Sequence, residues 1–596
     1  MSSDRPIDAA RPLKVIYIGA GVSGIVGAIQ FRKLLPSVEL VIYEKNADIG
    51  GTWYENRYPG CACDVPSHVY QLSSESWTEW TQFYSGAPEI WEYWNRVAIK
   101  HDIRKHVRLS HKCVEARWDD VRAKWTVKLQ QLDANPSVLI EDEADVLITG
   151  TGLLNEWKWP AIEGLHSFNG DLLHTANWDE SVDLANKSVA VIGAGSSGIQ
   201  VVPALVSKVK SMDHYVRGKT WISNQINEEF LKEKTSDANF NYSAEEKRFW
   251  RENPSAYLSY RKSLEMGLQT FWEITLRDSA RHASARIDYE RNMIKRLSPK
   301  PELIGQLIPE FPPLCKRLTP GPGYLEALTA PNVSLVSQAI ASVSAEGVTT
   351  VDGVTRPVDA IICATGFETN PGHGFPIYGR DGINLRDKYK VRPRTYLGLC
   401  TDNFPNFFQS LGPNAFQGAG SLLITIEYTH SYIGQVLQRL AHGNVRTIEP
   451  KRKQVDNFTN FCEEYFKKTV YTTDCVSWYK SSPAGATIEE RKNARVTALW
   501  PGSSIHAIHA LESVRWDDFD MDTFGGDDFA WFGNGSSLVD RNRAPEAEHL
   551  TWYLNGTQFL HEHKEPTNGM NGVNGVCGEA SEANDKEFRK RKRIQV

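Results

Sequence analysis

The sequence predicts an α/β fold with two separate parallel-sheet domains, because one pattern of apolar residues occurs twice. An apolar run over Leu13–Ile18 is followed by helix-like periodicity through Leu35 and by a second apolar run over Leu40–Tyr43. This order is typical of a strand, a turn, a helix and a further strand. The pattern returns over Ser188–Val216. Two such units far apart in one chain predict two nucleotide-binding domains.

Length and composition restrict the class of protein. The 596 residues exceed what one compact core holds, so we expect two or three domains. Apolar residues make up 41% and charged residues 23%, which is typical of soluble globular proteins. The net charge of -6 leaves no broad basic field, which argues against nucleic acid as a partner. No apolar stretch is long enough for a signal segment or a membrane span, so we expect a cytoplasmic protein that does not bind membranes.

The cysteines do not indicate a disulfide framework, because nine of them are spread over the whole chain. Cys61 and Cys63 are separated by one residue, whereas zinc sites and dithiol centres usually use wider pairs. We therefore predict no metal site.

The first glycine motif follows a predicted strand directly and contains Gly19, Gly21, Ser23 and Gly24. Its glycines permit a tight turn, a close backbone approach to a pyrophosphate and close packing of the next helix. The helix N-terminus then offers free N–H groups to the phosphates. Glu44 ends the next strand, where a carboxylate binds ribose hydroxyls and repels a 2′-phosphate. This Rossmann-like unit suits FAD or NAD.

The second unit has the same motif with an opposite charge partner. Its motif contains Gly193, Gly195, Ser196, Ser197 and Gly198. Arg217 stands where the first unit has its acidic residue, and Lys219 follows closely. A guanidinium pairs with a 2′-phosphate through a bidentate fork, so this pattern favours NADPH over NADH.

Two further predicted strands and a change in the residue pattern set the predicted domain boundaries. Asp145–Gly152 and Asp359–Phe367 each read as an acidic start, an apolar strand and a threonine–glycine stop. Between Ile222 and Pro313, charged and aromatic residues alternate without turn clusters, which indicates a helical insertion. We predict an FAD-binding part over 13–152, an NADPH-binding domain over 153–345 with its insertion over about 222–313, a returning FAD-binding part with a mobile loop over 346–555, and a disordered tail over 563–596.

The segment between the two units resembles a known family signature. Phe168, Gly170, His174 and Trp178 have the spacing of the Baeyer–Villiger signature. The chain is thus similar to class B flavoprotein monooxygenases, and within them to the type I Baeyer–Villiger monooxygenases of a fungal subgroup that acts on natural products. In this family the signature lies in the linker between the domains and couples their movement.

Other blocks carry the same resemblance. The loop Gly50–Gly60 resembles the second FAD-contacting loop, and the implied contacts from this region are Thr52, Trp53, Tyr54, Glu55, Ala62, Cys63, Asp64 and Tyr70. Cys315-Lys316-Arg317 resembles the basic pair of the family, and Ser477–Lys480 resembles its mobile loop. For NADPH the resemblance implies Gln200, Arg217, Gly218, Lys219, Lys316 and Trp478. The family often has Thr-Pro where this chain has Gly218-Lys219, which adds positive charge.

The resemblance implies a monooxygenase that uses both cofactors. NADPH reduces FAD, the flavin captures O2 as a C4a-peroxyflavin, and oxygen is inserted beside a ketone to give an ester or lactone. The anionic oxygens need a fixed positive charge, and arginine stays protonated under all usable conditions. We predict Arg317 as the catalytic stabiliser and Asp64 as the residue that orients it. The expected substrate is a bulky ketone of secondary metabolite biosynthesis.

Three alternatives stay open at this point. A flavin-dependent N- or S-oxygenase uses the same cofactors, although Trp178 and Arg317 argue against it. An NADPH-dependent disulfide reductase needs a reactive cysteine pair beside the flavin, and no pair has suitable spacing. A non-catalytic nucleotide sensor would not need the basic block at Lys316-Arg317.

Overall fold

The computed structural model describes residues 4–224, 239–369, 372, 374–481, 487–541 and 550–551. The chain divides into two compact units, Met1–Asn534 and Gly535–Val596. In the second unit, the Ser537 backbone and side chain both donate hydrogen bonds to Asp540. The tail predicted to be disordered, residues 563–596, lies outside the described residues.

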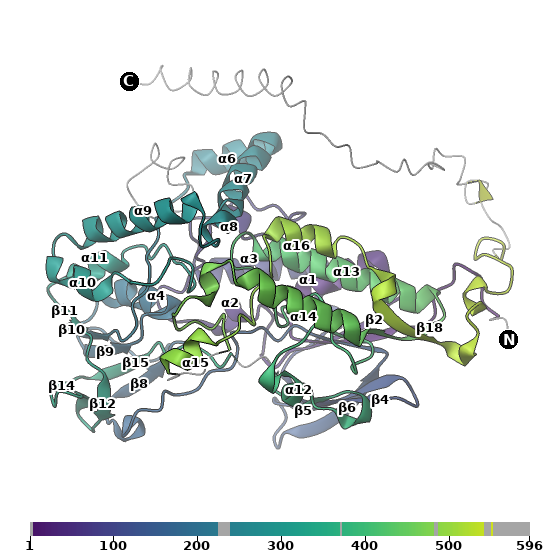
Figure 1. Cartoon of the computed structure of the whole chain (residues 1–596), viewed down its shortest axis with the longest axis horizontal. Helices are drawn as coiled ribbons and strands as arrows, with labels where there is room; N and C mark the ends of the chain where they lie inside the picture. Colours follow the sequence, from purple (N-terminus) through teal and green to yellow (C-terminus); the bar gives the residue numbers. More distant parts are fainter. Residues whose placement is uncertain are drawn as a thin grey trace, which may run out of the picture. The chain divides into compact units, whose positions relative to one another are not determined.

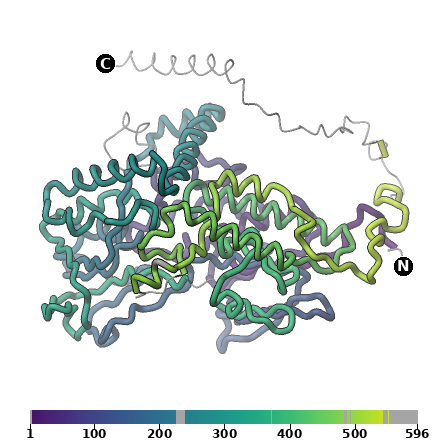
Figure 2. Tube along the Cα trace, viewed as in Figure 1, coloured from purple at the N-terminus to yellow at the C-terminus, as the bar shows by residue number. Residues whose placement is uncertain are grey.

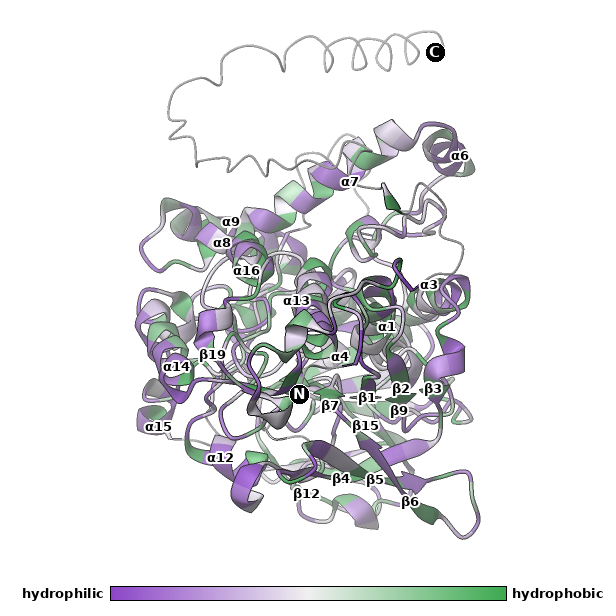
Figure 3. Ribbon diagram, turned by 90° about the vertical axis from the view of Figure 1, so that its right-hand side faces the viewer, coloured by the Kyte–Doolittle hydropathy of each residue, from purple (hydrophilic) through white to green (hydrophobic). Residues whose placement is uncertain are grey.

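The first predicted unit forms a parallel five-stranded sheet. Its strand order is β17 (Phe407–Gln409), β7 (Val146–Thr149), β1 (Lys14–Ile18), β2 (Glu39–Tyr43) and β3 (Val107–Arg108). Side chains of β1 alternate between two cores, as a strand requires. Val15 and Tyr17 face the core shared with α1 (Val22–Leu34), α3 (Ala87–Lys100) and α13 (Leu422–His442). Figure 3 shows hydrophobic colouring on β1, β2 and β7.

The opposite face of this sheet is covered by a second sheet. Its strand order is β16 (Ile377–Tyr378), β4 (His111–Asp119), β5 (Lys124–Gln131) and β6 (Val138–Ala144). Ile16 and Ile18 of β1 pack against its buried face, together with Trp125 and Val127. The dinucleotide sheet is thus buried on both faces, which explains its nearly continuous apolar strands.

The second predicted unit forms another parallel five-stranded sheet. Its strand order is β11 (Val333–Val336), β10 (Ser211–Tyr215), β9 (Ser188–Ile192), β15 (Ala360–Cys363) and β8 (Asp171–His174). One face packs on α4 (Ser196–Leu205) and α11 (Tyr324–Thr329), and the other on the antiparallel strands β12 (Ile340–Val343), β13 (Gly347–Thr350) and β14 (Thr355–Pro357). The predicted boundary at residue 345 was wrong. Strand β15 pairs with both β9 and β8, so this domain extends through Cys363.

The predicted insertion is helical over its described residues. It contains α6 (Ala244–Glu252), α7 (Pro254–Gln269), α8 (Phe271–Ile274), α9 (Ala280–Leu297), η4 (Pro301–Leu303) and α10 (Ile304–Leu307). Ser243 begins α6 with a capping box that includes Glu246. The Tyr257 hydroxyl of α7 accepts a hydrogen bond from the Gln71 side-chain amide and is hydrogen-bonded to His68 Nδ1 in the first domain, at 2.8 Å each. The insertion therefore joins the core of the other domain. Figure 1 labels its helices α6, α7, α8 and α9.

The chain after β15 contributes elements to the first domain. Figure 2 shows the green and yellow part of the chain beside the purple N-terminal part. Strand β17 pairs with β7, and α13 packs on α1. The other elements of this part are α12 (Leu385–Val391), β18 (Val445–Pro450), α14 (Arg452–Phe466), η6 (Val470–Thr472), α15 (Ile488–Lys492), α16 (Ser504–Leu511) and β19 (Phe519–Thr523). Within the described part of the chain, every helix is too short or too polar to cross a bilayer.

Candidate active site

The first glycine motif forms a loop that tolerates no side chain at its turn. Gly19 has a φ of +107°, and a Cβ there would lie 2.7 Å from the carbonyl oxygen of Gly150. A Cβ on Gly24 would lie 2.2 Å from the carbonyl oxygen of Gly19. Gly21 faces Gly51, where a Cβ would lie 2.9 Å from the Gly21 Cα. The two loops together form a backbone cradle that fits a pyrophosphate at the start of α1.

Glu44 is buried beside this cradle and fixes its shape. One carboxylate oxygen accepts from the Ala20 backbone N–H at 2.7 Å, and the other from Asn46 at 2.9 Å. Burial raises the pKa of Glu44. Each carboxylate oxygen keeps a second acceptor position that suits a ribose hydroxyl. The ribose contact itself stays a prediction. Ser23 differs from the expectation, because its buried hydroxyl accepts from Ser410 at 2.9 Å and therefore faces the protein.

The second FAD-contacting loop carries the short helix α2 (Thr52–Glu55). The Trp53 indole N–H donates to the Tyr70 hydroxyl at 3.1 Å, and the two rings meet edge to face. Glu55 forms an ion pair with Lys45, and Arg57 lies over the Tyr54 ring. Thr52 is exposed. The structure thus groups the predicted residues of this loop beside the glycine cradle.

The second glycine motif repeats the turn and leaves its phosphate side open. A Cβ on Gly193 would lie 2.4 Å from the Ala364 carbonyl oxygen, and one on Gly198 would lie 2.0 Å from that of Gly193. Gly195, by contrast, has no atom within 4 Å of its Cβ position. Ser196, which begins α4, is exposed. The N-terminus of α4 is therefore accessible to a pyrophosphate.

Arg217 and Lys316 form a basic pair after β10. Arg217 is exposed, and Lys316 is half-buried. Burial, and then the neighbouring Arg217 cation, lowers the pKa of Lys316. The Lys316 ammonium donates to the Lys219 carbonyl oxygen at 3.0 Å and lies 3.5 Å from the Cβ position of Gly218. Gly218 therefore leaves room for the ammonium, and the pair fits a 2′-phosphate.

The Lys219 side chain points elsewhere. Its ammonium donates to the Gly305 carbonyl oxygen of the insertion at 2.9 Å. The sequence predicted that Lys219 adds charge to the phosphate site, and the described structure instead uses this cation to hold the insertion.

Arg317 and Asp64 form a bidentate ion pair between the two domains. Arg317 Nε donates to Asp64 Oδ2 at 2.8 Å, and Nη2 donates to Oδ1 at 2.7 Å. The two side chains retain 32% and 18% of their exposure. Burial would lower the pKa of Arg317, yet the Asp64 carboxylate raises it above its ordinary value. The guanidinium is therefore a permanent charge at a fixed place.

Gln200 connects the second glycine helix to the first domain. Its amide oxygen accepts from the Tyr58 hydroxyl at 2.6 Å, and its amide nitrogen donates to the Ala62 carbonyl oxygen at 2.8 Å. A Cβ on Gly60 would lie 2.5 Å from the Gln200 carbonyl oxygen. The backbone N–H of the next residue, Cys63, donates to the Ser85 carbonyl oxygen at 3.1 Å. Gln200 and Ala62 were predicted to bind cofactor, and the structure shows them in a contact between domains.

The signature histidine, His174, is the last residue of β8, and it contacts the two linkers between the domains, one at Trp157 and the other at Thr365. His174 Nδ1 accepts from the Ala176 backbone N–H at 3.1 Å, so Nε2 carries the proton and faces the Thr365 hydroxyl at 3.1 Å. Its ring stacks on Trp157 at 4.6 Å. Burial lowers the pKa of His174 to about 4, so the ring is neutral. Trp178 packs against the core of the second domain.

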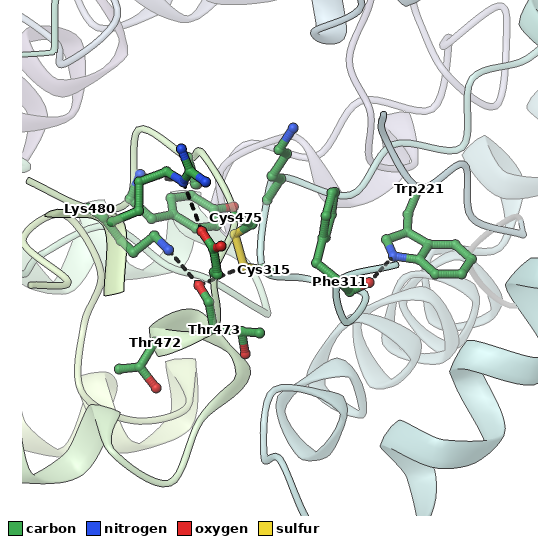
Figure 4. The surroundings of a disulfide bond; sticks show 12 residues. Trp221, Phe311, Cys315, Thr472, Thr473, Cys475 and Lys480 are labelled. Atoms are coloured by element: carbon green, nitrogen blue, oxygen red, sulfur yellow. Dashed lines mark hydrogen bonds and ion pairs between the residues drawn. A yellow bond between two sulfur atoms is a disulfide. The ribbon is translucent and has the colours of Figure 1, made fainter. Parts of the chain in front are cut away.

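A disulfide joins the basic block to the loop that contains Trp478. Cys315 and Cys475 are 160 positions apart, with their Cα atoms 6.4 Å apart. Figure 4 shows this bond with Thr473 and Lys480 on one side and Phe311 and Trp221 on the other. The Lys480 ammonium donates to the Thr473 carbonyl oxygen at 2.7 Å. This bond was not predicted from the sequence, because two cysteines this far apart carry no pairing signal.

Comparisons with known proteins agree with this geometry. Residues 18–87 match the NAD(P)-binding Rossmann-like domain family. Over 550 residues the chain is 36% identical to the FAD-binding monooxygenase moxY of Dothistroma septosporum, which covers 91% of this chain and 85% of that protein. Over 504 residues it is 31% identical to a Baeyer-Villiger monooxygenase of Pseudomonas aeruginosa, with 84% and 90% covered. The solved complex of OTEMO with FAD and NADP has a TM-score of 0.73 at 25% identity and covers 86% of this chain and 100% of that chain.

These similarities extend over most of the chain, 91% of it for moxY and 84% for the Baeyer-Villiger monooxygenase. They confirm the predicted α/β fold with two Rossmann-like sheets, and they confirm FAD and NADPH as the cofactors. The chain therefore belongs to the FAD- and NADPH-dependent Baeyer–Villiger monooxygenases.

Proposed function

We propose that this enzyme inserts one oxygen atom beside the carbonyl of a bulky natural-product ketone. The balanced reaction converts a ketone, O2, NADPH and a proton into an ester or lactone, NADP+ and water. The observation that carries the proposal is the bidentate pair of Arg317 with Asp64. The FAD-binding monooxygenase moxY supports the monooxygenase activity, because it shares 36% identity with this chain over most of its length.

Arg317 would stabilise the negative charge that develops on oxygen during insertion. Bound FAD supplies the chemistry, since it accepts hydride from NADPH and activates O2. Arg317 uses Nε and Nη2 for Asp64, so that carboxylate does not engage Nη1. A fixed donor of this kind stabilises a developing anion without reorganisation. Asp64 would hold the guanidinium plane and partly balance its charge.

The second domain would present NADPH to the flavin. The open N-terminus of α4 at Gly195 and Ser196 would bind the pyrophosphate. Arg217 and Lys316 would bind the 2′-phosphate, and Gly218 leaves space for the lysine. The neutral His174 would hold both linkers in one arrangement during hydride transfer.

The test supplies NADPH, labelled 18O2 and a set of cyclic, aryl and polycyclic ketones. We expect one labelled atom in the ester and one in water, with polycyclic ketones converted more efficiently than cyclohexanone. Boiled enzyme and unlabelled O2 are the controls. Oxidation of amines or thioethers, with every ketone unchanged, would contradict the proposal and favour an N- or S-oxygenase.

A further inference from the structure

The side chain of Gln200 connects helix α4 to a loop of the first domain. Gln200 lies one turn after Ser196, the first residue of α4. Its amide oxygen accepts from the Tyr58 hydroxyl at 2.6 Å, and its amide nitrogen donates to the Ala62 carbonyl oxygen at 2.8 Å. A backbone carbonyl oxygen can only accept, so these partners fix which end of the amide faces which residue. Both polar ends of the side chain are thus used between the two domains.

The loop and the helix are also packed closely together. Tyr58 belongs to the first domain in sequence, yet its side chain is 6% exposed and packs in the core of the second domain. A Cβ on Gly60 would lie 2.5 Å from the Gln200 carbonyl oxygen and 2.9 Å from the Ala204 Cβ. The loop therefore approaches the helix as closely as a glycine permits. Helix α4 cannot slide or turn on this loop without breaking the hydrogen bonds and the packing.

This contact lies between the two glycine cradles. The loop begins at Gly51, which faces the first glycine motif, and it ends at Asp64. Helix α4 begins at the second glycine motif, whose open N-terminus fits the pyrophosphate of NADPH. Another link of the loop, the ion pair of Arg57 with Glu180 at 3.4 Å, is exposed on both sides and contributes little. The amide of Gln200 therefore joins the element that fits one cofactor to the element that fits the other.

We propose that Gln200 is a positioning residue for hydride transfer, because its amide holds α4, and with it bound NADPH, at a set distance from the flavin. In this step NADPH transfers a hydride to FAD, which leaves NADP+ and the reduced flavin. Displacement of the reacting groups by about 1 Å can cost about a hundredfold in rate. The role concerns reduction of the flavin and is independent of the proposed ketone.

The first experiment compares Gln200→Met with Gln435→Met in the FAD-loaded enzyme. Methionine keeps the length of the side chain and removes its hydrogen bonds. Gln435 is the matched control, because its amide also joins two segments, but within the first domain. It donates to the Glu512 carbonyl oxygen at 3.0 Å and accepts from the Val514 N–H at 3.4 Å.

The measurement is the limiting rate of flavin reduction. NADPH is mixed with each enzyme in the absence of oxygen, and the loss of flavin absorbance is followed. We expect Gln200→Met to lower this rate about tenfold, because buried groups that lose their hydrogen bonds favour a shifted helix. Gln435→Met should keep the parental rate. A parental rate in Gln200→Met would overturn the proposal.

Affinity for the cofactor distinguishes positioning from cofactor binding. Calorimetric titration with NADP+ should give the parental Kd for Gln200→Met, because Arg217, Lys316 and the N-terminus of α4 are unchanged. A weaker Kd with a parental limiting rate would make Gln200 a cofactor-binding residue and would overturn the proposal. Neither measurement needs a ketone, so a parent that forms no ester would refute the proposed function and leave this test valid.

Tyr58→Phe tests the same contact from the other domain. Phenylalanine keeps the ring in the core and removes only the hydroxyl, so this variant decides the proposal if Gln200→Met fails to retain FAD. It should also slow flavin reduction, and the double variant should be no slower than Gln200→Met, because both changes break one contact. Melting temperatures of the parent, the two single variants and the double variant should show the same non-additivity. Single effects that multiply in the double variant would overturn the shared contact.

Discussion

Arg317 and Arg296 make the same kind of ion pair in two different places. Arg296 binds Glu326 through Nε at 2.8 Å and Nη2 at 2.9 Å. That pair lies between α9 and α11 inside the second domain, whereas the pair of Arg317 joins the two domains. A comparison of variants at the two arginines therefore distinguishes the contribution of such an ion pair to stability from a role in oxygen transfer.

Arg317→Ala should lose ester formation while it keeps FAD, because the glycine cradle and Glu44 lie in another part of the site. Removal of one fixed electrostatic donor lowers the rate about a hundredfold or more. Residual NADPH oxidation should appear as hydrogen peroxide. The measurement is ester per NADPH, at matched FAD content and melting temperature. Arg296→Ala should lower the melting temperature and leave this ratio unchanged. Parental ester formation by Arg317→Ala would remove Arg317 from the mechanism.

Arg217→Ala should raise the KM for NADPH about tenfold and leave the KM for NADH nearly unchanged. The reason is the loss of a charge-assisted contact to the 2′-phosphate, which NADH lacks. Lys219→Ala is the matched control, because its ammonium binds the Gly305 carbonyl. Steady-state kinetics with both cofactors decides this. Equal loss with NADPH and NADH would place Arg217 outside the phosphate site.

Helix α7 belongs to the insertion in the second domain, but its packing partners lie in the first domain. It packs on η1 (Ser67–Val69) and on the core around α13. Glu265 of α7 lies near Glu427 of α13, and Arg261 balances them in part. Glu427 accepts from the Ser73 N–H at 2.9 Å and also from its hydroxyl. Two carboxyl groups thus share one partly buried junction between the insertion and the first domain.

This junction should make stability depend on pH. Burial, with the Glu427 charge, raises the pKa of Glu265 from 4.5 to about 7. Folding therefore favours the protonated carboxyl. The stability that it contributes is fully present below its unfolded pKa and is lost as the pH rises through the folded pKa. Glu265→Gln should raise the melting temperature at about pH 8.5 and give no gain at about pH 4.5.

The control for this pH dependence is Glu290→Gln, since Glu290 is exposed on α9. Thermal melts of the three proteins across the pH range give the comparison. The gain of Glu265→Gln at high pH should correspond to about 2 kcal/mol. A gain of the same size at both ends of the range would exclude titration of Glu265 as its cause.

At the scale of the molecule, the FAD site is assembled from both ends of the first unit. Strand β1, helix α2 and the returning strand β17 meet there, and the Ser410 hydroxyl after β17 reaches Ser23. We expect a yellow protein with tightly but non-covalently bound FAD. Heat or acid precipitation should release FAD into the supernatant, where chromatography identifies it. Released FMN, or a folded protein without colour, would contradict this prediction.

Gly51→Ala should weaken this FAD binding. Its Cβ would lie 2.9 Å from the Gly21 Cα and would push the two loops of the cradle apart. Gly353→Ala is the matched control, because Gly353 also has a positive φ but has no atom within 4 Å of its Cβ position. FAD content per chain is the measurement. Equal FAD loss in both variants would indicate backbone strain in place of the clash.

Local patterns in the sequence predicted much of this arrangement. Strand, turn and helix follow each other within about thirty residues, so Gly19, Gly193 and Glu44 could be placed from spacing alone. The Arg317–Asp64 pair was expected only through the family resemblance. The contacts of Gln200 with Tyr58 and Ala62 depend on how two distant segments meet, and no local pattern encodes that. Lys219 shows a similar limit, because its hydrogen bond to the Gly305 carbonyl depends on where the insertion folds back, and its contact with the 2′-phosphate stays a prediction.

The Cys315–Cys475 bond also changes what a protease would reveal. It closes a covalent ring that includes the end of the second sheet and most of the returning part. A single nick inside this ring leaves both pieces attached, so the band on a non-reducing gel keeps the mass of the whole chain. The same sample separates into two bands once the bond is reduced. A nick outside the ring releases a fragment in either gel. The pair of lanes therefore tells whether the chain was cut between residues 315 and 475 or outside them.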